Sequence, residues 1–167
     1  MMASTIVIGL GNPLLSDDAV GLAAVARLAT RFHLPDDVEL MDGGTWGMKL
    51  LPAIEAAERV LLLDAIDTAA APGTLTRLEG EAIPATLSVL MSPHQVDLRE
   101  VLAVCALRGT TPSIMVALGV QPETMATHVG MSTRVDAQVD ALADQAADVL
   151  RTWGHAVTAR EAAPAAV

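Results

Sequence analysis

Apolar residues recur along the chain in runs that alternate between a strand pattern and a helix pattern. The β-branched run Thr5–Leu10 closes on glycine, asparagine and proline, which predicts a buried strand that ends in a turn. Apolar positions then recur about one helical turn apart. This spacing predicts a helix from near Asp17 to near Arg31, with Asp17 as its N-cap.

The same two patterns predict the later elements. Further strands are expected at Val38–Met41, Arg59–Ala65, Gly73–Leu78 and Ser113–Val120. Further helices are expected from Thr45 to about Ala57, from Pro93 past Cys105, and from Val135 to Trp153. The strand expected at Arg59–Ala65 contains an unbroken apolar stretch, which indicates burial on both faces, whereas Gly73–Leu78 alternates weakly and is expected at a sheet edge. A solvated acidic face is predicted for the last helix at Asp136, Asp140, Asp144 and Asp148.

Strands that alternate with helices predict an α/β fold, a three-layer sandwich in which a twisted, mostly parallel sheet of about five strands is flanked by helices. Residues 1–155 are expected to form a single domain. Residues 156–167 are small and weakly patterned, so we expect them to form a loose tail. In such sheets a ligand binds beyond the carboxyl ends of the strands, where the direction of winding reverses.

The composition of the chain argues against several classes of function. The chain has 52% hydrophobic residues, 2% aromatic residues and a formal net charge of −10. Few aromatic side chains and a negative charge argue against a nucleic-acid partner. No apolar stretch approaches the roughly 20 residues that cross a bilayer, so membrane insertion is not expected. The single Cys105 sits in an apolar helical pattern, which favours a packed thiol and a cytoplasmic location.

Two acidic residues are candidates for the chemistry. The glycine-rich turn after the first strand lacks the third glycine of a dinucleotide loop, and Asp17 and Asp18 lie where a phosphate would need donors. One aspartate suffices to cap a helix, so Asp18 is available to face the sheet edge. Asp64 ends a strongly apolar strand, where a carboxylate needs a cation or several donors, although capping of the next loop, with Thr68, is an alternative.

A histidine supplies a third candidate. His94 is expected in the first turn of its helix, where the macrodipole favours a neutral imidazole that can bind a metal. Two carboxylates and one imidazole would bind a divalent ion and leave positions open, although two carboxylates can also activate water without a metal. The other three histidines, His33, His128 and His155, are expected to be exposed.

Several ordered blocks of the sequence resemble the nickel-iron hydrogenase maturation endopeptidases, which remove a C-terminal tail from the hydrogenase large subunit. The matching blocks are IVIGLGNPLLSDDAVG (Ile6–Gly21), MDGGTWGMKLL (Met41–Leu51), LLLDAID (Leu61–Asp67), APGT (Ala71–Thr74) and SPHQVDLREVL (Ser92–Leu102). The resemblance implies the phosphorylase/hydrolase-like form of the three-layer sandwich.

The resemblance also implies a site. The metal-binding positions of the family fall on Asp18, Asp64 and His94, with Asp18 and Asp64 as candidate catalytic bases. Family members can carry Glu instead at the first of these positions. The turn Asp42, Gly43, Gly44 and Thr45 resembles the family's substrate-contact loop, although a tight turn before a helix explains it equally well. The implied metal is nickel, which is carried by the large-subunit precursor and is not permanently bound.

Two other functions stay open at this point. A nickel-dependent chaperone or binding module for the same precursor, without cleavage, would need the same crevice. A phosphorylase-like hydrolase of small molecules would need a phosphate or sugar site, and the sequence offers no pattern for one. Endopeptidase activity on the hydrogenase large-subunit precursor is the function that the blocks favour.

Overall fold

The core of the fold is a five-stranded sheet. The computed structural model describes residues 4–87 and 93–161, without the side chains at 87 and 93–97. The strands are β1 (Thr5–Leu10), β3 (Val38–Gly44), β4 (Arg59–Ala65), β5 (Leu75–Glu79) and β6 (Ile114–Val120). Their order is β3-β1-β4-β6-β5, with the first four parallel and β5 antiparallel at one edge. The predicted α/β three-layer fold is confirmed, as is the edge position of the weakly alternating strand.

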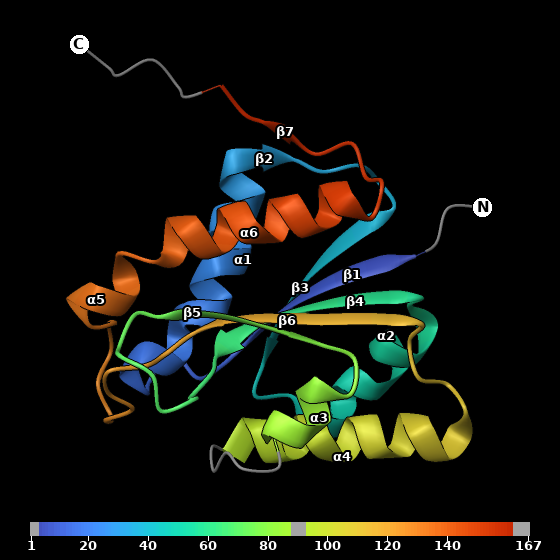
Figure 1. Cartoon of the computed structure of the whole chain (residues 1–167), viewed down its shortest axis with the longest axis horizontal. Coiled ribbons are helices and arrows are strands. Elements are labelled where there is room, and N and C mark those ends of the chain that lie inside the picture. Colours follow the sequence, from blue (N-terminus) through green and yellow to red (C-terminus); the bar gives the residue numbers. More distant parts are fainter. Residues whose placement is uncertain (1–3, 88–92, 162–167) are drawn as a thin grey trace.

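Helices cover both faces of this sheet (Figure 1). One face carries α1 (Val20–Arg31) and α6 (Val139–Thr152), and the opposite face carries α2 (Leu51–Ala56), α3 (Ala82–Leu87) and α4 (Pro93–Arg108). Two short 3-10 helices, η1 (Ser16–Ala19) and η2 (Gly47–Leu50), precede α1 and α2, and α5 (Thr133–Asp136) precedes α6. The predicted helix from Asp17 to Arg31 therefore forms as η1 followed by α1, and the predicted last helix is divided into α5 and α6.

Strand β4 is buried on both faces, as its apolar run predicts. Leu61 and Leu63 pack into the core beneath α1 and α6, whereas Val60 and Leu62 pack into the core on the α4 side. Cys105 of α4 lies in that second core and is fully buried. Burial raises the pKa of the Cys105 thiol and the nearby Glu55 carboxylate acts in the same direction, so this cysteine has the packed role that was predicted.

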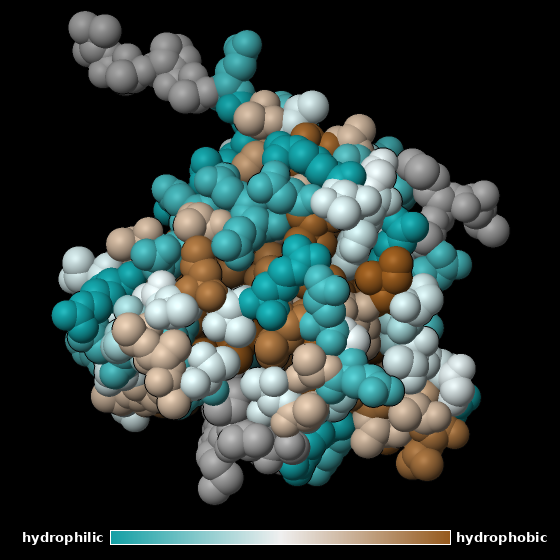
Figure 2. All heavy atoms as spheres, in the orientation of Figure 1, coloured by the Kyte–Doolittle hydropathy of each residue, from teal (hydrophilic) through white to brown (hydrophobic). Residues whose placement is uncertain are grey.

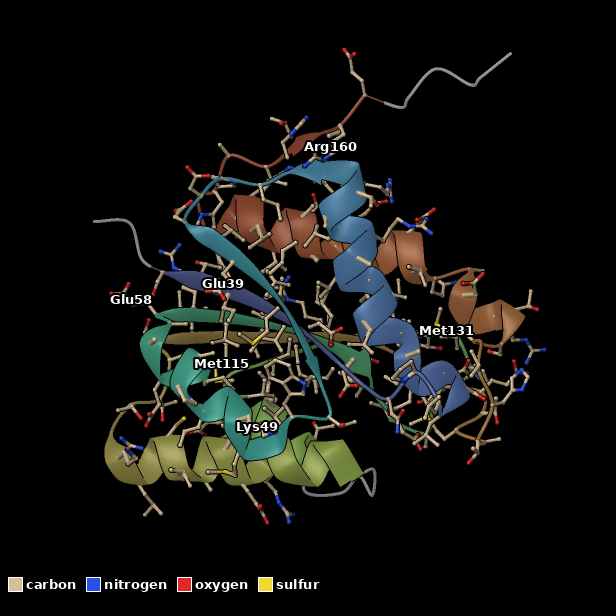
Figure 3. All side chains as sticks on the ribbon, turned by 180° about the vertical axis from the view of Figure 1, so that it is seen from behind. Glu39, Lys49, Glu58, Met115, Met131 and Arg160 are labelled. Carbon is tan, nitrogen blue, oxygen red and sulfur yellow. The ribbon has the colours of Figure 1, made fainter. Side chains whose placement is uncertain are left out.

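Strand β3 forms the second edge of the sheet. It continues three residues beyond the predicted end at Met41, so Asp42, Gly43 and Gly44 belong to the strand and not to a turn after it. The register against β1 shifts where Leu10 pairs with Gly44, which marks a bulge. In Figure 3, which views the molecule from behind, β3 crosses in front of the other strands, with Glu39 labelled along it.

The end of the chain differs from the expected loose tail. Thr158 and Ala159 form the short strand β7, which pairs with β2 (Phe32–His33), and Val157 is buried. Arg160 donates from its backbone N–H to the carbonyl of Arg31 at 2.7 Å and lies beside the end of α1 (Figure 3). Backbone pairing that no apolar repeat announces therefore docks residues 157–160, and residues 162–167 lie outside the described part of the chain.

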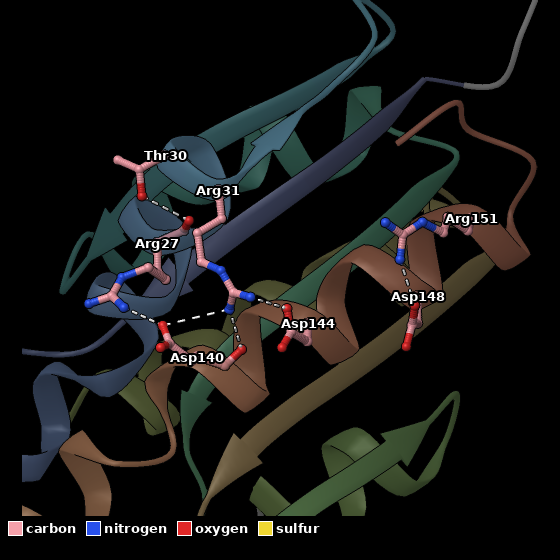
Figure 4. A network of polar contacts seen from close by, with 7 residues as sticks. All are labelled: Arg27, Thr30, Arg31, Asp140, Asp144, Asp148 and Arg151. Atoms are coloured by element: carbon pink, nitrogen blue, oxygen red, sulfur yellow. Dashed lines mark hydrogen bonds and ion pairs between the residues drawn. The ribbon is translucent and has the colours of Figure 1, made fainter. Parts of the chain in front are cut away.

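The acidic stripe that was predicted for the last helix is exposed at Asp136, Asp140 and Asp148 and half-buried at Asp144, and it also pairs with α1 (Figure 4). Asp140 pairs with Arg27 and Arg31, and Asp144 pairs with Arg31 at 3.0 Å. The side chains of these pairs are between 37% and 57% exposed, so each pair contributes less than about 1 kcal/mol to stability. Their effect is to align α1 with α6 on this face of the sheet.

The surface above α6 is mostly hydrophilic, and hydrophobic atoms appear between α6 and the edge strand β5 (Figure 2). A shallow hollow there is lined by Leu75, Arg77, Leu118, Gln145 and Asp148. Within the described ranges, no helix combines the length and the apolar character that crossing a membrane requires.

A close approach between α1 and the sheet depends on Gly21. A Cβ at this position would lie 2.1 Å from the carbonyl oxygen of Leu63 and 2.5 Å from that of Leu10. These are backbone atoms, so no side-chain rotation can relieve the overlap. Helix α1 can therefore approach the carboxyl ends of β1 and β4 only because residue 21 has no side chain.

Gly21→Ala is accordingly expected to lower the free energy of unfolding by about 2 to 3 kcal/mol, measured by urea denaturation. Helix propensity alone would change stability in the opposite direction, by about 1 kcal/mol. The control is Ala26→Gly on the exposed side of the same helix, which should cost only that propensity term. A Gly21→Ala protein as stable as the wild type would contradict the proposed close packing.

Candidate functional site

The candidate site lies where the winding of the sheet reverses. Strand β4 lies directly beside β1, with Leu63 opposite Gly9, as the predicted doubly wound order requires. Asp64 therefore follows at the carboxyl edge next to the end of β1. Helix η1, which carries Asp18, contacts β4 at the same edge. The structure thus places Asp18 and Asp64 on adjoining elements, 46 residues apart in sequence.

Asp18 is held by the turn that follows β1. Its side chain is fully buried, and its Oδ2 accepts a hydrogen bond of 2.8 Å from the backbone N–H of Asn12. Gly11 makes the turn possible, because its φ is +127° and a Cβ there would lie 1.7 Å from the carbonyl oxygen of Asp18. The glycine-rich sequence after β1 therefore positions a carboxylate and not a phosphate.

Asp64 is also buried, with 3% of its surface exposed. Its Oδ1 accepts a 2.8 Å hydrogen bond from the N–H of Ala65, and not from Thr68 as loop capping would require. The carboxyl lines a small apolar cavity beneath α3 and α4. The other residues around that cavity are Leu10, Leu62, Ile66, Leu78, Ile83, Leu98 and Ala117. An apolar wall of this kind strengthens the interaction between a carboxylate and any cation that reaches it.

The loop after β4 bonds to Gln121 instead. Oε1 of Gln121 accepts hydrogen bonds from the N–H groups of Thr68 and Ala70, and its Nε2 donates to Asp67 at 2.9 Å. The N–H of Ala69 and the amide of Gln121 lower the pKa of the exposed Asp67 carboxyl. Asp67 thus belongs to the surface of the loop, in contrast to Asp64 three residues earlier.

His94 lies in the first turn of α4, as predicted, but its side chain lies outside the part of the chain that the structure describes. Helix α4 ends at Arg108, shortly before β6 starts at the amino edge of the sheet, so its first turn lies at the carboxyl edge (Figure 1). Leu98, one turn after position 94, lines the same cavity as Asp64. Among the described side chains, no group of three acidic, histidine or cysteine residues could hold a metal, and His94 is not among them.

The candidate substrate-contact residues lie at the end of edge strand β3. Asp42 and Thr45 are exposed, and a Cβ on Gly43 would lie 2.6 Å from Cγ2 of Ile8. The carbonyl of Gly44 accepts a hydrogen bond of 3.1 Å from the N–H of Gly11, which ties this segment to the turn that holds Asp18. The helix that was expected to begin at Thr45 begins instead at Gly47, as η2. The N-cap of η2 is Trp46, which makes no side-chain capping bond.

Asp17 has a role that the sequence pattern missed. It was expected to cap the first helix, but the N-cap residue of η1 is Leu15 and no side chain caps it. The fully buried Asp17 carboxylate instead accepts hydrogen bonds from three backbone N–H groups and one hydroxyl of the loop after β6. The donors and distances are Glu123 N–H at 2.8 Å, Thr124 N–H at 3.0 Å, Ser132 N–H at 2.6 Å and Ser132 Oγ at 3.0 Å.

The remaining histidines are divided between the surface and the interior. His33 and His128 are exposed, as predicted. His155 is buried, and the expectation of exposure is wrong for it. Its Nε2 lies 2.9 Å from Oγ1 of Thr5 and its Nδ1 lies 3.1 Å from a carboxylate oxygen of Asp37. These contacts lie at the amino edge of the sheet, far from Asp64 along β4, so His155 belongs to the docking of the C-terminal segment.

Comparisons with known proteins show the family to which this chain belongs. The family described as hydrogenase maturation protease matches residues 22–149. The hydrogenase 2 maturation protease of Escherichia coli (strain K12) is 38% identical over 158 residues, which cover 94% of this chain and 96% of that protein. The hydrogenase expression/formation protein HupD of Rhodobacter capsulatus is 38% identical over 155 residues, or 92% of this chain and 74% of that protein.

The solved structures that this chain resembles include hydrogenase maturation proteases as well. The hydrogenase maturating endopeptidase HybD from E. coli superposes with a TM-score of 0.90 at 37% sequence identity, covering 93% of this chain and 97% of that one. The [NiFe] hydrogenase maturation protease HybD from Thermococcus kodakarensis, at 23% identity and a TM-score of 0.71, shares the fold. The chain therefore belongs to the hydrogenase maturation protease family.

Proposed function

We propose that this chain is the endopeptidase that removes the C-terminal extension of a nickel-iron hydrogenase large-subunit precursor after nickel has been inserted. Nickel arrives as part of the substrate, and Asp18, Asp64 and His94 complete its coordination. The metal thereby reports that the precursor is ready to be cleaved. The observation that carries the proposal is the placement of two buried carboxylates at one sheet edge in a protein of this family.

The chemistry of the residues supports a divalent guest. Two carboxylates held in an apolar environment at a topological switch point favour a doubly positive ion strongly. An imidazole beside two carboxylates is a donor set that suits a transition metal, and it leaves coordination positions for the precursor's own ligands. The position of His94 in the first turn of α4, one turn before Leu98, is consistent with its being the third ligand.

Peptide hydrolysis requires an activated water, and Asp18 and Asp64 are the candidate bases. The carboxylate accepts a proton from water as the water oxygen bonds to the scissile carbonyl carbon. The same proton then passes to the amide nitrogen as the C–N bond breaks, which leaves a carboxylate on the large subunit and an amine on the released tail. Nickel in the substrate can polarise the same carbonyl or water. The exposed Asp42 and Thr45, beside the two glycines, would contact the extended peptide.

The test is to incubate the protein with nickel-loaded and with nickel-free precursor and to weigh the products by mass spectrometry. We expect the precursor to lose its C-terminal tail only when nickel is present. Binding without tail loss would instead support a non-cleaving nickel-dependent chaperone. Cleavage at equal rates with and without nickel would contradict the recognition of nickel by this chain. We place this processing in the cytoplasm, a location supported by the single free, packed Cys105.

A further inference from the structure

Exposed apolar side chains gather at the edge of the sheet that carries the candidate site. The described part of the chain has seven large apolar side chains that are exposed, and five of them follow the carboxyl ends of β1, β3 and β6. We call these five residues the apolar rim: Leu14 (57% exposed), Trp46 (54%), Met48 (44%), Met125 (36%) and Val129 (71%). The other two, Leu107 and Ile114, lie towards the amino edge. Single exposed apolar residues are common, but a group on neighbouring loops marks an interaction surface.

The loops that carry the apolar rim are joined to one another by backbone hydrogen bonds. The N–H of His128 donates to the carbonyl of Leu14 at 2.9 Å, and the N–H of Ser16 donates to the carbonyl of His128 at 2.9 Å. On the other side, Gly11 is bonded to Gly44, and Trp46 lies within 4 Å of the ideal Cβ position at Gly44. The apolar rim is therefore continuous with both the turn that holds Asp18 and the candidate substrate-contact segment.

The surface is also fixed in position before any partner binds. The four hydrogen bonds from residues 123–132 to Asp17 hold the loop that carries Met125 and Val129. Asp17 is the direct neighbour of Asp18, so the same short helix positions the loop and the candidate site. A preorganised apolar surface loses little conformational entropy when a partner covers it.

On the basis of the proposed function, we propose that the apolar rim is the docking surface for an apolar segment of the precursor polypeptide near its cleavage site, and that this docking does not require nickel. A second copy of this chain is a less suitable occupant. A copy seated on the rim would cover the carboxyl edge of the sheet and block the approach of a peptide bond to Asp18 and Asp64. The apolar rim then supplies most of the affinity for the precursor, and the candidate metal site makes cleavage depend on nickel.

The experiment measures the affinity for nickel-free precursor, which is not expected to be cleaved. Leu14→Ser combined with Val129→Ser should weaken binding about 10-fold in Kd, because central apolar contacts dominate such interfaces. The matched control is Leu107→Ser, which removes an even more exposed leucine (88%) from the end of α4 and should leave Kd unchanged. With nickel-loaded precursor, the double variant should raise KM by a similar factor and leave kcat near its wild-type value.

Trp46 gives a direct readout of the apolar rim. The chain has two tryptophans, so 5-fluorotryptophan labelling gives two fluorine resonances, which Trp46→Phe assigns. We expect the Trp46 resonance, and not that of Trp153, to shift when nickel-free precursor is added.

The possible outcomes separate this proposal from the proposed function. Wild-type affinity in the double variant, equal weakening by Leu107→Ser, or no binding of nickel-free precursor by the wild type would each overturn docking at the rim. A self-association of the wild type that the double variant abolishes, without any effect on precursor binding, would also overturn it and assign the surface to a second copy. Rim-dependent binding without any tail loss would leave the docking surface intact and refute the endopeptidase function. Normal tail loss together with wild-type precursor affinity in the double variant would support the endopeptidase function and refute docking at the apolar rim.

Discussion

Asp64→Asn is expected to lower the rate of tail removal from nickel-loaded precursor by about 100-fold or more, the range lost when a positioned acid or base is removed. The substitution keeps the shape of the side chain and the oxygen that accepts from the N–H of Ala65, and it removes the negative charge. The fold should persist, since Asp64 lies at the end of a strand whose apolar residues stay unchanged. Single-turnover kinetics followed by mass spectrometry, together with thermal unfolding, separate the loss of chemistry from the loss of structure.

Asp67→Asn is the matched control for this experiment. It makes the same chemical change three residues later, at an exposed carboxylate that bonds to Ala69 and Gln121. Its rate should equal that of the wild type. Asp18→Asn should be as inactive as Asp64→Asn, whereas Asp18→Glu, which keeps the charge on a longer side chain, should keep measurable activity. Asp64→Asn with a wild-type rate would exclude Asp64 both as base and as ligand.

The strands and the positions of the candidate carboxylates follow from local patterns. The limits of β1 and β4 agree with the strands predicted at Thr5–Leu10 and Arg59–Ala65. A strand that is buried on both faces is apolar along most of its length, so its ends can be recognised in the sequence. Asp64 could be placed because it is the charged residue that directly follows the apolar residues 60–63, near the end of the strand. Its proximity to Asp18 followed from the usual strand order, which places β4 beside β1.

Three features that the sequence did not predict depend on contacts between distant segments. Asp17 has the position and the residue type of a helix cap, and nothing near it indicates that its partners are residues 123–132. His155 and β7 likewise find their partners at Thr5, Asp37 and β2, more than 100 residues away. The apolar rim has the same origin. Leu14, Trp46 and Val129 are isolated apolar residues in three separate loops, and only the fold brings the loops to one edge.

The second large effect is expected at Asp17, since a buried carboxylate with four donors has no substitute in this fold. Asp17→Ala leaves the N–H groups of Glu123, Thr124 and Ser132 without this acceptor, which should lower the free energy of unfolding by about 3 kcal/mol. Asp17→Asn keeps one oxygen but turns an amide donor towards N–H groups, so an intermediate loss is expected. Asp136→Ala, at an exposed position of α5, should cost less than about 0.5 kcal/mol.

Hydrogen exchange at single residues distinguishes the loss of the Asp17 hydrogen bonds to residues 123–132 from a general loss of stability. In Asp17→Ala, amide hydrogen exchange should accelerate in residues 123–132 far more than in the core strands β1 and β4. Because that loop carries Met125 and Val129, the KM for nickel-loaded precursor should rise more than kcat falls, which simple destabilisation would not produce. Unchanged exchange in residues 123–132 would show that other contacts hold the loop. Preorganisation of the apolar rim could then not be attributed to the carboxylate next to Asp18.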